Sequence, residues 1–422
     1  MNAGDEQFER PLHGVKVLEL SQIMAGPTCG LMLADMGAEV YKVEKFPAGD
    51  DSRNYRREGD SGLPPSFMML NRGKRSIGIN FKSPEGKAAL LRMVAQADVL
   101  TENFRLGVME RLGLGYDVLK EVNSALIYCS VTGYGREGPL ASKGGFDLIL
   151  QAFSGLISVT GEEGGEPVKP GISIADVNAG VLAAVGILAA YIHRLRTGKG
   201  QRVDTSLLQA SMQQLYWYAA GYFSHRIVPT PSGTAHPIVA PYQVFRCADG
   251  RMAIGGANQA NWERIADVLG HPEWKTDPRF DSSEIRHSNR KILAALIEEV
   301  LASDTLASWL ERFDAASIPA GPVNDVGQAL EHEQARAVRM VVDVEGPEGK
   351  TMRALGLPIL FNGTTHVAKS APPRVGEDSA DILREFQFSE EEIDKLVSSG
   401  AVFQTETGRR ISAAEVTEAI PS

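Results

Sequence analysis

Asp176 is the residue of this sequence whose type and position point most directly to chemistry. It lies in the segment Gly-Ile-Ser-Ile-Ala-Asp-Val-Asn-Ala-Gly (171–180), just before the small, apolar run Val181–Ala190. If that run is helical, the partly positive N–H groups at its start favour an ionised carboxylate held in a fixed direction. An ionised carboxylate is a nucleophile that needs no neighbouring base. The simpler alternative is that Asp176 only caps the helix, because aspartate is among the commonest N-cap residues.

Cations and an aromatic residue follow several predicted strands: Lys45, Lys82 and the run Asn103-Phe104-Arg105. Ligands bind at the carboxyl ends of the strands in a doubly wound sheet, where lysines meet phosphates and an aromatic plane beside an arginine suits an adenine ring. The alternative is that the lysines and the arginine are solvated surface residues and that the phenylalanine belongs to the core. A glycine-rich loop from Gly133 to Asp147 would let the backbone approach a ligand closely.

Strand and helix patterns alternate through the first half of the chain. Strands are predicted at 15–20, 38–43, 76–81, 99–102 and 126–131, and helices at 25–36 and 83–97. This alternation predicts an α/β fold with a doubly wound, Rossmann-like, mostly parallel sheet. A long helix from Asp176 to Arg196, a strand at 201–207 and a helix from Leu208 to Phe223 complete this part.

The Pro- and Gly-rich link Pro229–Pro237 marks a candidate domain boundary in the 422-residue chain. Beyond it, a predicted hairpin around Asp249-Gly250 and several helices indicate a smaller α+β domain. The predicted division is therefore a large domain over 1–228, a small domain over 229–330, and a C-terminal part, 331–422, that returns to the large domain.

Composition excludes several classes of protein. The net charge is −10 and no cluster of lysine and arginine is present, which argues against nucleic acid as a partner. The three cysteines lie far apart and no HExxH motif occurs, so no disulfide framework and no metal site is expected. The acidic N-terminus lacks an apolar core, and no apolar run is expected to reach the roughly 18 residues of a membrane span. We therefore expect a cytoplasmic protein that does not bind membranes.

A nicotinamide-dependent oxidoreductase is an alternative from another class. The first predicted strand, turn and helix look like a dinucleotide fold, but the turn carries only Gly26 and Gly30 and lacks G-x-G-x-x-G. Pro27 also lacks the N–H that could bind a pyrophosphate. This alternative is therefore weak.

Several short segments, spread from about Pro11 to Val402, resemble the family III CoA-transferases, which include formyl-CoA transferase, carnitine CoA-transferase and α-methylacyl-CoA racemase. The matching segments are Gly14–Leu20, Ala25–Pro27, Gly37–Lys45, Gly49–Asp51, Asn71–Ser76, Glu102–Arg105, Gly133–Gly135, Ala175–Val177 and Thr197–Gln201. The chain looks most like the branch that handles dicarboxylates, such as succinyl-CoA:glutarate and acetyl-CoA:oxalate transferases.

The resemblance implies a role for each matching position. Asp176 falls on the catalytic, nucleophilic aspartate. The positions that hold coenzyme A in relatives fall on Met24, Ala25, Lys45, Ile79, Asn80, Phe81, Lys82, Asn103, Phe104, Arg105, Arg111, Lys143, Gly144, Gly145, Phe146 and Asp147. The family also implies an interlocked homodimer, acyl-CoA and a carboxylic acid as substrates, no tightly bound cofactor and no metal.

One departure separates this chain from the racemases of the family. They carry a histidine in a Gly-His-Asp segment, whereas this chain reads Gly145-Phe146-Asp147. A phenylalanine cannot transfer a proton, so racemisation by acid/base groups on two sides loses one of them. We therefore expect CoA transfer from a donor such as succinyl-CoA to a free carboxylic acid, and the resemblance to the dicarboxylate branch implies that this acid is a dicarboxylic acid. Acyl-CoA racemisation and a non-catalytic CoA-binding protein remain alternatives. Cations that could meet a distal carboxylate are Arg53, Arg57 and Arg246.

Overall fold

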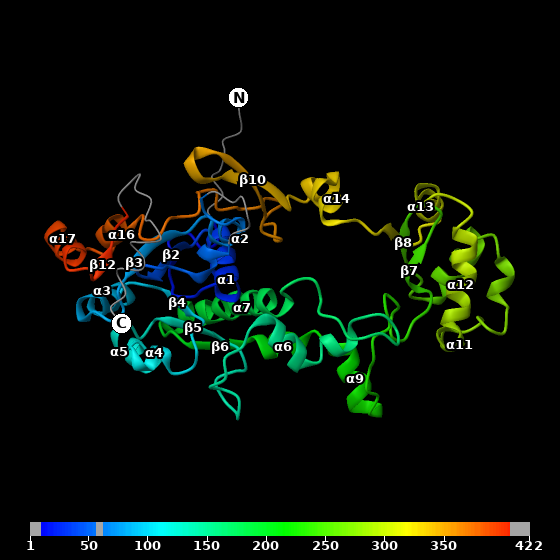
Figure 1. Ribbon diagram of the computed structural model, residues 1–422, viewed down its shortest axis with the longest axis horizontal. Helices are drawn as coiled ribbons and strands as arrows, with labels where there is room; N and C mark the ends of the chain where they lie inside the picture. Colours follow the sequence, from blue (N-terminus) through cyan, green and yellow to red (C-terminus); the bar gives the residue numbers. More distant parts are fainter. Residues whose placement is uncertain (1–9, 56–61, 406–422) are drawn as a thin grey trace. The chain divides into compact units, whose positions relative to one another are not determined.

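The computed structural model describes residues 10–55 and 62–405, which form two compact units (Figure 1). The first unit comprises Met1–Leu156, Pro170–Ala219 and Gln334–Ser422, and the second comprises Ile157–Lys169 and Ala220–Glu333. The predicted domain ranges did not include the short excursion Ile157–Lys169 into the second unit.

A seven-stranded sheet forms the centre of the first unit, in the order β12-β3-β2-β1-β4-β5-β6. All neighbours are parallel except β12, which runs antiparallel to β3 at the edge. This confirms the predicted α/β class and mostly parallel sheet. The strands are β1 (Lys16–Glu19), β2 (Glu39–Lys45), β3 (Arg75–Ile79), β4 (Val99–Glu102), β5 (Ile127–Thr132), β6 (Arg202–Ser206) and β12 (Val402–Phe403).

Successive residues of a strand point to opposite faces of the sheet, and here both faces carry apolar side chains. Helices therefore cover both faces. Val17 belongs to one apolar cluster together with α1 and α7, whereas its neighbour Leu18 belongs to a second cluster with α3 and α16. Both residues are fully buried. The helices of the first unit are α1 (Ala25–Asp35), α2 (Pro65–Asn71), α3 (Pro84–Val94), α4 (Val108–Arg111), α5 (Tyr116–Val122), α6 (Asp147–Ser154), α7 (Ile174–Thr197), α8 (Leu207–Gln213), α16 (Ser379–Glu385) and α17 (Glu390–Ser398).

The helix ends follow local chemistry. Ser83 caps α3 by accepting a hydrogen bond from Gly86 N, and Gly198 ends α7 with a φ of 71°. The single helix predicted from Leu208 to Phe223 is wrong, because α8 ends at Gln213 and α9 (Tyr216–His225) begins after a turn.

The expectation that no apolar segment reaches membrane-spanning length is also wrong. Among the described residues, α7 alone is long and apolar enough, with a mean hydropathy of 1.7 over its best window. One face of α7, including Ala179 and Ala183, packs into the core against α1, α8 and β5. Core packing of this kind accounts for part of its apolar composition, since 39% of that window is buried.

The second unit has an antiparallel sheet of β7 (Tyr242–Arg246), β8 (Arg251–Gly255) and β9 (Ala320–Pro322), which confirms the predicted hairpin. A core around Trp262, Phe280 and Trp309 joins it to α10 (Gln259–Val268), α12 (Arg290–Leu301) and α13 (Leu306–Ala315). The short helix α11 (Ser283–Ser288) precedes α12. Two short helices, α14 (Val326–Glu331) and α15 (Glu333–Ala337), precede an antiparallel pair in the first unit, β10 (Val341–Glu345) and β11 (Thr351–Leu355).

Candidate active site

The sheet changes direction of growth between β1 and β4, and ligands of doubly wound folds bind at such a point. The turns that follow these two strands are tied together. Gln22 N donates to Asn103 Oδ1 at 2.9 Å, and Asn103 Nδ2 donates to Gln22 O at 2.9 Å. The structure therefore brings Met24 and Ala25 to the same sheet edge as the run Asn103–Arg105.

The turn Ser21–Met24 contains an unusual backbone conformation. Ile23 has a φ of 69°, in the left-handed region. A β-branched residue there costs on the order of 1–3 kcal/mol, so neighbouring contacts must hold it. Both carboxylate oxygens of Asp50 accept from Ile23 N, at 3.1 and 3.2 Å.

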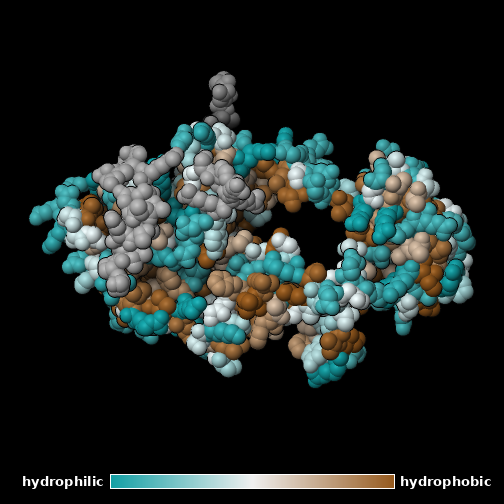
Figure 2. Space-filling model, in the orientation of Figure 1, coloured by the Kyte–Doolittle hydropathy of each residue, from teal (hydrophilic) through white to brown (hydrophobic). Residues whose placement is uncertain are grey.

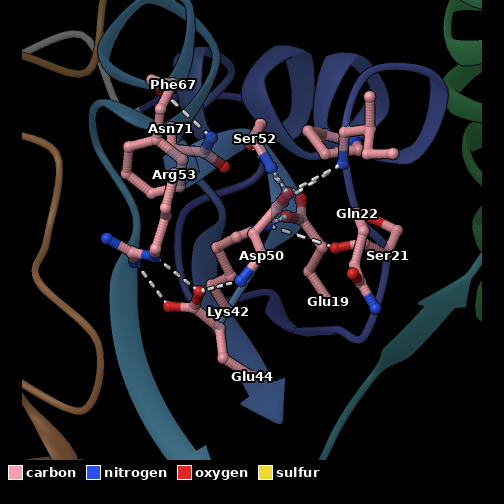
Figure 3. A network of polar contacts seen from close by, with 12 residues as sticks. Glu19, Ser21, Gln22, Lys42, Glu44, Asp50, Ser52, Arg53, Phe67 and Asn71 are labelled. Atoms are coloured by element: carbon pink, nitrogen blue, oxygen red, sulfur yellow. Dashed lines mark hydrogen bonds and ion pairs between the residues drawn. The ribbon is translucent and has the colours of Figure 1, made fainter. Parts of the chain in front are cut away.

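Asp50 belongs to a buried network of charged side chains beneath this turn (Figure 3). Lys42 Nζ lies 2.8 Å from Asp50 Oδ2 and 3.0 Å from Glu19 Oε1, and Lys74 Nζ lies 2.9 Å from Glu19 Oε2. Burial alone would raise the pKa of Asp50, but Lys42 and bonds from Ser52 lower that pKa to about 2. Burial lowers the pKa of Lys74 to about 8, despite the attraction of Glu19.

Gly26 and Gly30 have packing roles rather than phosphate-binding ones. A Cβ on Gly26 would lie 2.1 Å from Ser21 Cβ, and a Cβ on Gly30 would lie 1.7 Å from Glu19 Oε2. The two glycines therefore let α1 lie directly on the turn and on the buried Glu19.

Three of the predicted CoA residues, Lys45, Phe81 and Phe104, line a small cavity of about 10 Å³. Ser21, Gln22 and Asp50 also line it. Lys45 is exposed and pairs with Asp51 at 2.6 Å. Ile79 is buried at the end of β3, whereas Lys82 is exposed. Asn80 Oδ1 accepts from Lys82 N at 3.0 Å and so shapes the loop after β3.

The loops after β4 and β5 also meet at this edge. A Cβ on Gly144 would lie 3.2 Å from Arg105 Nε, and one on Gly133 would lie 2.9 Å from Gly145 Cα. The backbone contact at Gly133 requires glycine, whereas at Gly144 the arginine side chain would have to shift slightly. Of the remaining predicted residues, Arg111 ends the short helix α4, Lys143 lies 5.8 Å over the ring of Tyr134, and Phe146, just before α6, is 65% exposed.

Asp176 is the third residue of α7 and is not its cap. The N-cap position is Ser173, whose side chain makes no capping bond. The carboxylate of Asp176 is partly buried and has no hydrogen-bond or ion-pair partner among the described residues. The capping interpretation of Asp176 is therefore wrong, and its oxygens are uncommitted.

Asp147, the first residue of α6, instead accepts a hydrogen bond from a backbone N–H group in the first turn of α7. Its Oδ1 accepts from Ala175 N at 3.0 Å and lies 3.5 Å from Asp176 N, and its Oδ2 accepts from Gln151 Nε2 at 2.6 Å. Burial, and then the charge of Asp147, raise the pKa of Asp176 to about 7. Burial and the charge of Asp147 thus oppose the helix dipole, which by itself would favour the ionised carboxylate expected from the sequence.

The start of α7 lies against the start of α1. A Cβ on Gly180 would lie 2.5 Å from Ala25 O. Asp176 and Gly180 are four residues apart and therefore share a face of the helix. The same face thus carries Asp176 toward the Met24–Ala25 turn and its neighbouring glycine loop.

Sequence reasoning gave no role to Glu19, Lys42 and Asp50, although a charged residue at the end of the apolar strand β1 and one in the middle of β2 were a usable signal for the first two. It also offered Arg53 for a distal carboxylate, but Arg53 is buried and bonds Glu44 at 2.6 and 2.8 Å. Arg57 lies outside the described residues, and Arg246 is an exposed residue of the second unit.

A cavity of about 290 Å³ lies within the second unit, lined by Arg246, Arg251 and Glu163 among others. None of the predicted catalytic or CoA-binding residues lines it. Over residues 10–55 and 62–405, no group of three or more His, Cys, Asp or Glu side chains could hold a metal ion.

Comparison with known proteins assigns the family. The model of CoA-transferase family III matches residues 12–379. The chain belongs to CoA-transferase family III. This confirms the resemblance seen in the sequence. A solved CAIB/BAIF family protein from Brucella suis shares the fold with a TM-score of 0.79 and 38% identity, covering 89% of this chain and 99% of that one.

Two curated relatives carry specific names. Succinyl-CoA:glutarate CoA-transferase of Mus musculus is 34% identical over 399 residues, covering 94% of this chain and 92% of its own. Acetyl-CoA:oxalate CoA-transferase of Acetobacter aceti is 37% identical over 385 residues, covering 89% and 96%. The family III chain described here is accordingly a CoA-transferase that uses CoA thioesters as substrates.

Proposed function

We propose that this enzyme moves CoA from an acyl-CoA donor to a free dicarboxylic acid, with Asp176 as the nucleophile. The observation that carries the proposal is the uncommitted, partly buried carboxylate of Asp176 in the first turn of α7. A carboxylate with a pKa raised to about 7 by burial and by Asp147 is a perturbed group of the kind that marks reactive sites.

The proposed reaction proceeds through two covalent species. An oxygen of Asp176 attacks the thioester carbonyl, and the C–S bond breaks to give a mixed anhydride and CoA thiolate. The thiolate attacks the Asp176 carbonyl, which forms an aspartyl-CoA thioester and releases the donor carboxylate. The acceptor carboxylate then attacks this thioester, and the released thiolate takes the acyl group from the new anhydride. Asp176 is returned as a carboxylate, so no oxidant or base is consumed.

Each attack develops negative charge on a carbonyl oxygen, which needs fixed N–H donors. The close backbones of Gly133 and Gly145 support this role for the glycine-rich loop. The loop leads directly into Asp147, the first residue of α6, which accepts a hydrogen bond from Ala175 N in the first turn of α7. Removal of one such donor typically lowers a rate by about 10²–10³-fold.

CoA is proposed to lie along the carboxyl edge of the sheet. Exposed Lys45 and Lys82 suit phosphates, while Phe81 and Phe104 offer apolar surface for the adenine ring. The matching contacts on the other side of β1 are Met24, Ala25, Asn103, Arg105, Arg111, Lys143, Gly144, Gly145, Phe146 and Asp147.

A dicarboxylate acceptor is supported by the names of the two curated relatives. The test is a screen of succinyl-CoA and acetyl-CoA donors against glutarate, oxalate and mesaconate, each beside a monocarboxylate of matched length, with product mass spectrometry. We expect new dicarboxyl-CoA esters and little transfer to the monocarboxylates. Deuterium exchange at Cα without any acceptor acid would instead support the racemase alternative.

A homodimer is proposed from exposed apolar side chains on the first unit. Leu148, Ile149 and Phe153 of α6 are 50%, 45% and 56% exposed, and Leu195 of α7 is 71% exposed. Hydrophobic surface gathers over α6 in the space-filling view (Figure 2). Apolar patches of this kind mark interfaces between proteins. Light scattering that gives a mass near twice 45.6 kDa would support the dimer, and a monomer at micromolar concentration would contradict it.

A cytoplasmic location is proposed from the cysteines. Cys29, Cys129 and Cys247 are buried, free thiols, as expected in a reducing compartment. Fractionation of cells that produce the enzyme would test this placement.

A further inference from the structure

The left-handed Ile23 stands directly before two of the residues placed against CoA. A φ of 69° is a rare conformation for a β-branched residue, so it persists only where surrounding contacts fix it. Met24 and Ala25 follow at once, and α1 begins at Ala25. The contacts that fix Ile23 therefore also fix the direction of the backbone at Met24 and Ala25, along the sheet edge where CoA is proposed to bind.

Asp50 is the group that holds it. Both of its oxygens accept from Ile23 N, at 3.1 and 3.2 Å (Figure 3). Asp50 is itself immobilised, since Oδ1 also accepts from Ser52 N and Oγ at 2.9 and 2.7 Å and Oδ2 pairs with Lys42 at 2.8 Å. Lys42 Nζ also fixes the start of the turn, because it donates a hydrogen bond to Ser21 O at 3.2 Å.

The charges of this cluster cancel. Glu19 and Asp50 carry the two negative charges, and Lys42 and Lys74 carry the two positive ones. All four side chains are at most 2% exposed. A neutral, buried cluster offers little field to attract the phosphates of CoA, so its influence on the binding edge is geometric.

The turn that Asp50 holds forms part of the wall of the small cavity at this edge. Ser21, Gln22 and Asp50 line it on one side, and Phe81 and Phe104 line it with them. A turn that relaxed away from the left-handed form would therefore change the wall that faces the aromatic residues.

We propose that Asp50 is a positioning residue for CoA, which acts by holding the strained turn Ser21–Met24 through the N–H of Ile23. This inference rests on the proposed placement of CoA and adds a residue that does not itself need to contact the nucleotide. The buried pair of Asp50 and Lys42 is thus a support for the binding edge as well as part of the core.

The test uses variants that keep the buried cluster neutral. Lys42→Met combined with Asp50→Asn removes one charge of each sign but retains a side-chain oxygen that can accept from Ile23 N. Lys42→Met combined with Asp50→Ala removes that oxygen as well. A third variant adds Ile23→Gly to the alanine version, because glycine adopts positive φ without strain.

Asp35→Asn is the matched control. It weakens another buried pair, Asp35 with Arg72 at 2.6 Å, but lies at the last residue of α1, away from the turn. For every variant the dissociation constant for CoA is measured by calorimetry, together with the melting temperature and the kcat and KM for an acyl-CoA donor.

We expect the alanine version to bind CoA about tenfold or more weakly than the asparagine version, since one hydrogen bond to a strained site is lost. Its KM should rise while kcat at saturation stays within about threefold. Adding Ile23→Gly should restore most of the affinity for CoA, because glycine adopts the left-handed conformation of the turn without strain and no longer needs the bond from Asp50. Asp35→Asn should lower the melting temperature and leave CoA affinity unchanged.

Two results would overturn the inference while leaving the proposed function intact. The first is equal CoA affinity for the alanine and asparagine versions when the wild type binds CoA. The second is a folded triple variant in which Ile23→Gly restores nothing. Failure of the wild-type protein to bind CoA would refute the proposed function, and the inference with it.

Discussion

Asp50 and Asp176 are two aspartates of the same unit in opposite electrostatic environments. Asp50 is buried among partners, and Lys42 and Ser52 hold its pKa down at about 2. Among the described residues, Asp176 has no hydrogen-bond or ion-pair partner, and burial with the nearby charge of Asp147 raises its pKa to about 7. The partnered carboxylate supports the architecture, whereas the carboxylate without a described partner is the one that we propose as the nucleophile.

The largest expected effect comes from removing the unpartnered carboxylate. Asp176→Ala should reduce transferase activity by roughly 10³-fold or more, because no other group takes over a covalent step. CoA binding and the melting temperature should stay near those of the wild type. The control is Asp117→Asn on α5, an exposed aspartate paired with Lys120 at 2.7 Å, which should have full activity. Turnover near the wild-type rate in Asp176→Ala would contradict the proposal that Asp176 is the nucleophile.

Breaking the partnered cluster should affect stability rather than chemistry. Lys74→Met leaves Glu19 with one cation fewer, and loss of one member of a buried pair destabilises a protein by about 3–5 kcal/mol. The double variant Lys74→Met with Glu19→Gln restores neutrality and should be less destabilised. Denaturant unfolding measures both. A single variant as stable as the double variant would show that these charges are not interdependent.

The pH dependence of the reaction tests the cause of the raised pKa. Since the carboxylate form of Asp176 is the proposed nucleophile, kcat/KM should fall as pH decreases through about 7. Asp147→Asn removes the like charge, so the fall should move to lower pH. The new amide can still accept from Ala175 N and can bond the side chain of Gln151, whose Oε1 has no partner in the described structure. An unchanged profile would mean that Asp147 does not act on Asp176.

The smallest effect is expected for Lys45. If its ammonium meets the 3′-phosphate, Lys45→Ala should weaken CoA by about tenfold and dephospho-CoA much less, as one exposed charge pair is lost. Calorimetric titration with both ligands measures this difference. Equal losses for the two ligands would place Lys45 elsewhere on the nucleotide.

The parallel sheet could be predicted from sequence because its strands are short apolar runs separated by capped helices. The start of α3 illustrates this, since Ser83 and Pro84 predict the cap that the structure shows. The break between α8 and α9 could not be predicted, because Gln214 and Leu215 carry no proline or glycine to mark it.

The residues of the proposed site could be named from the sequence, but their electrostatics could not. Asp176 stood out because it precedes a small, apolar helix. Burial, the larger cause of its raised pKa, is a property of the folded chain, and Asp147, whose charge adds to the effect, is 29 positions earlier and is brought near by the packing of α6. The buried charges of Glu19, Lys42 and Asp50 could not be paired from sequence, because pairing depends on strand register.

The account depends most on a covalent bond to Asp176 during turnover. The direct measurement is to mix the enzyme with an acyl-CoA, quench with hydroxylamine or borohydride, and map the modified peptide by mass spectrometry. The account predicts a hydroxamate or a reduced side chain at Asp176 that appears only when the acyl-CoA is present. An unmodified Asp176 in enzyme shown to be turning over under the same conditions would contradict it.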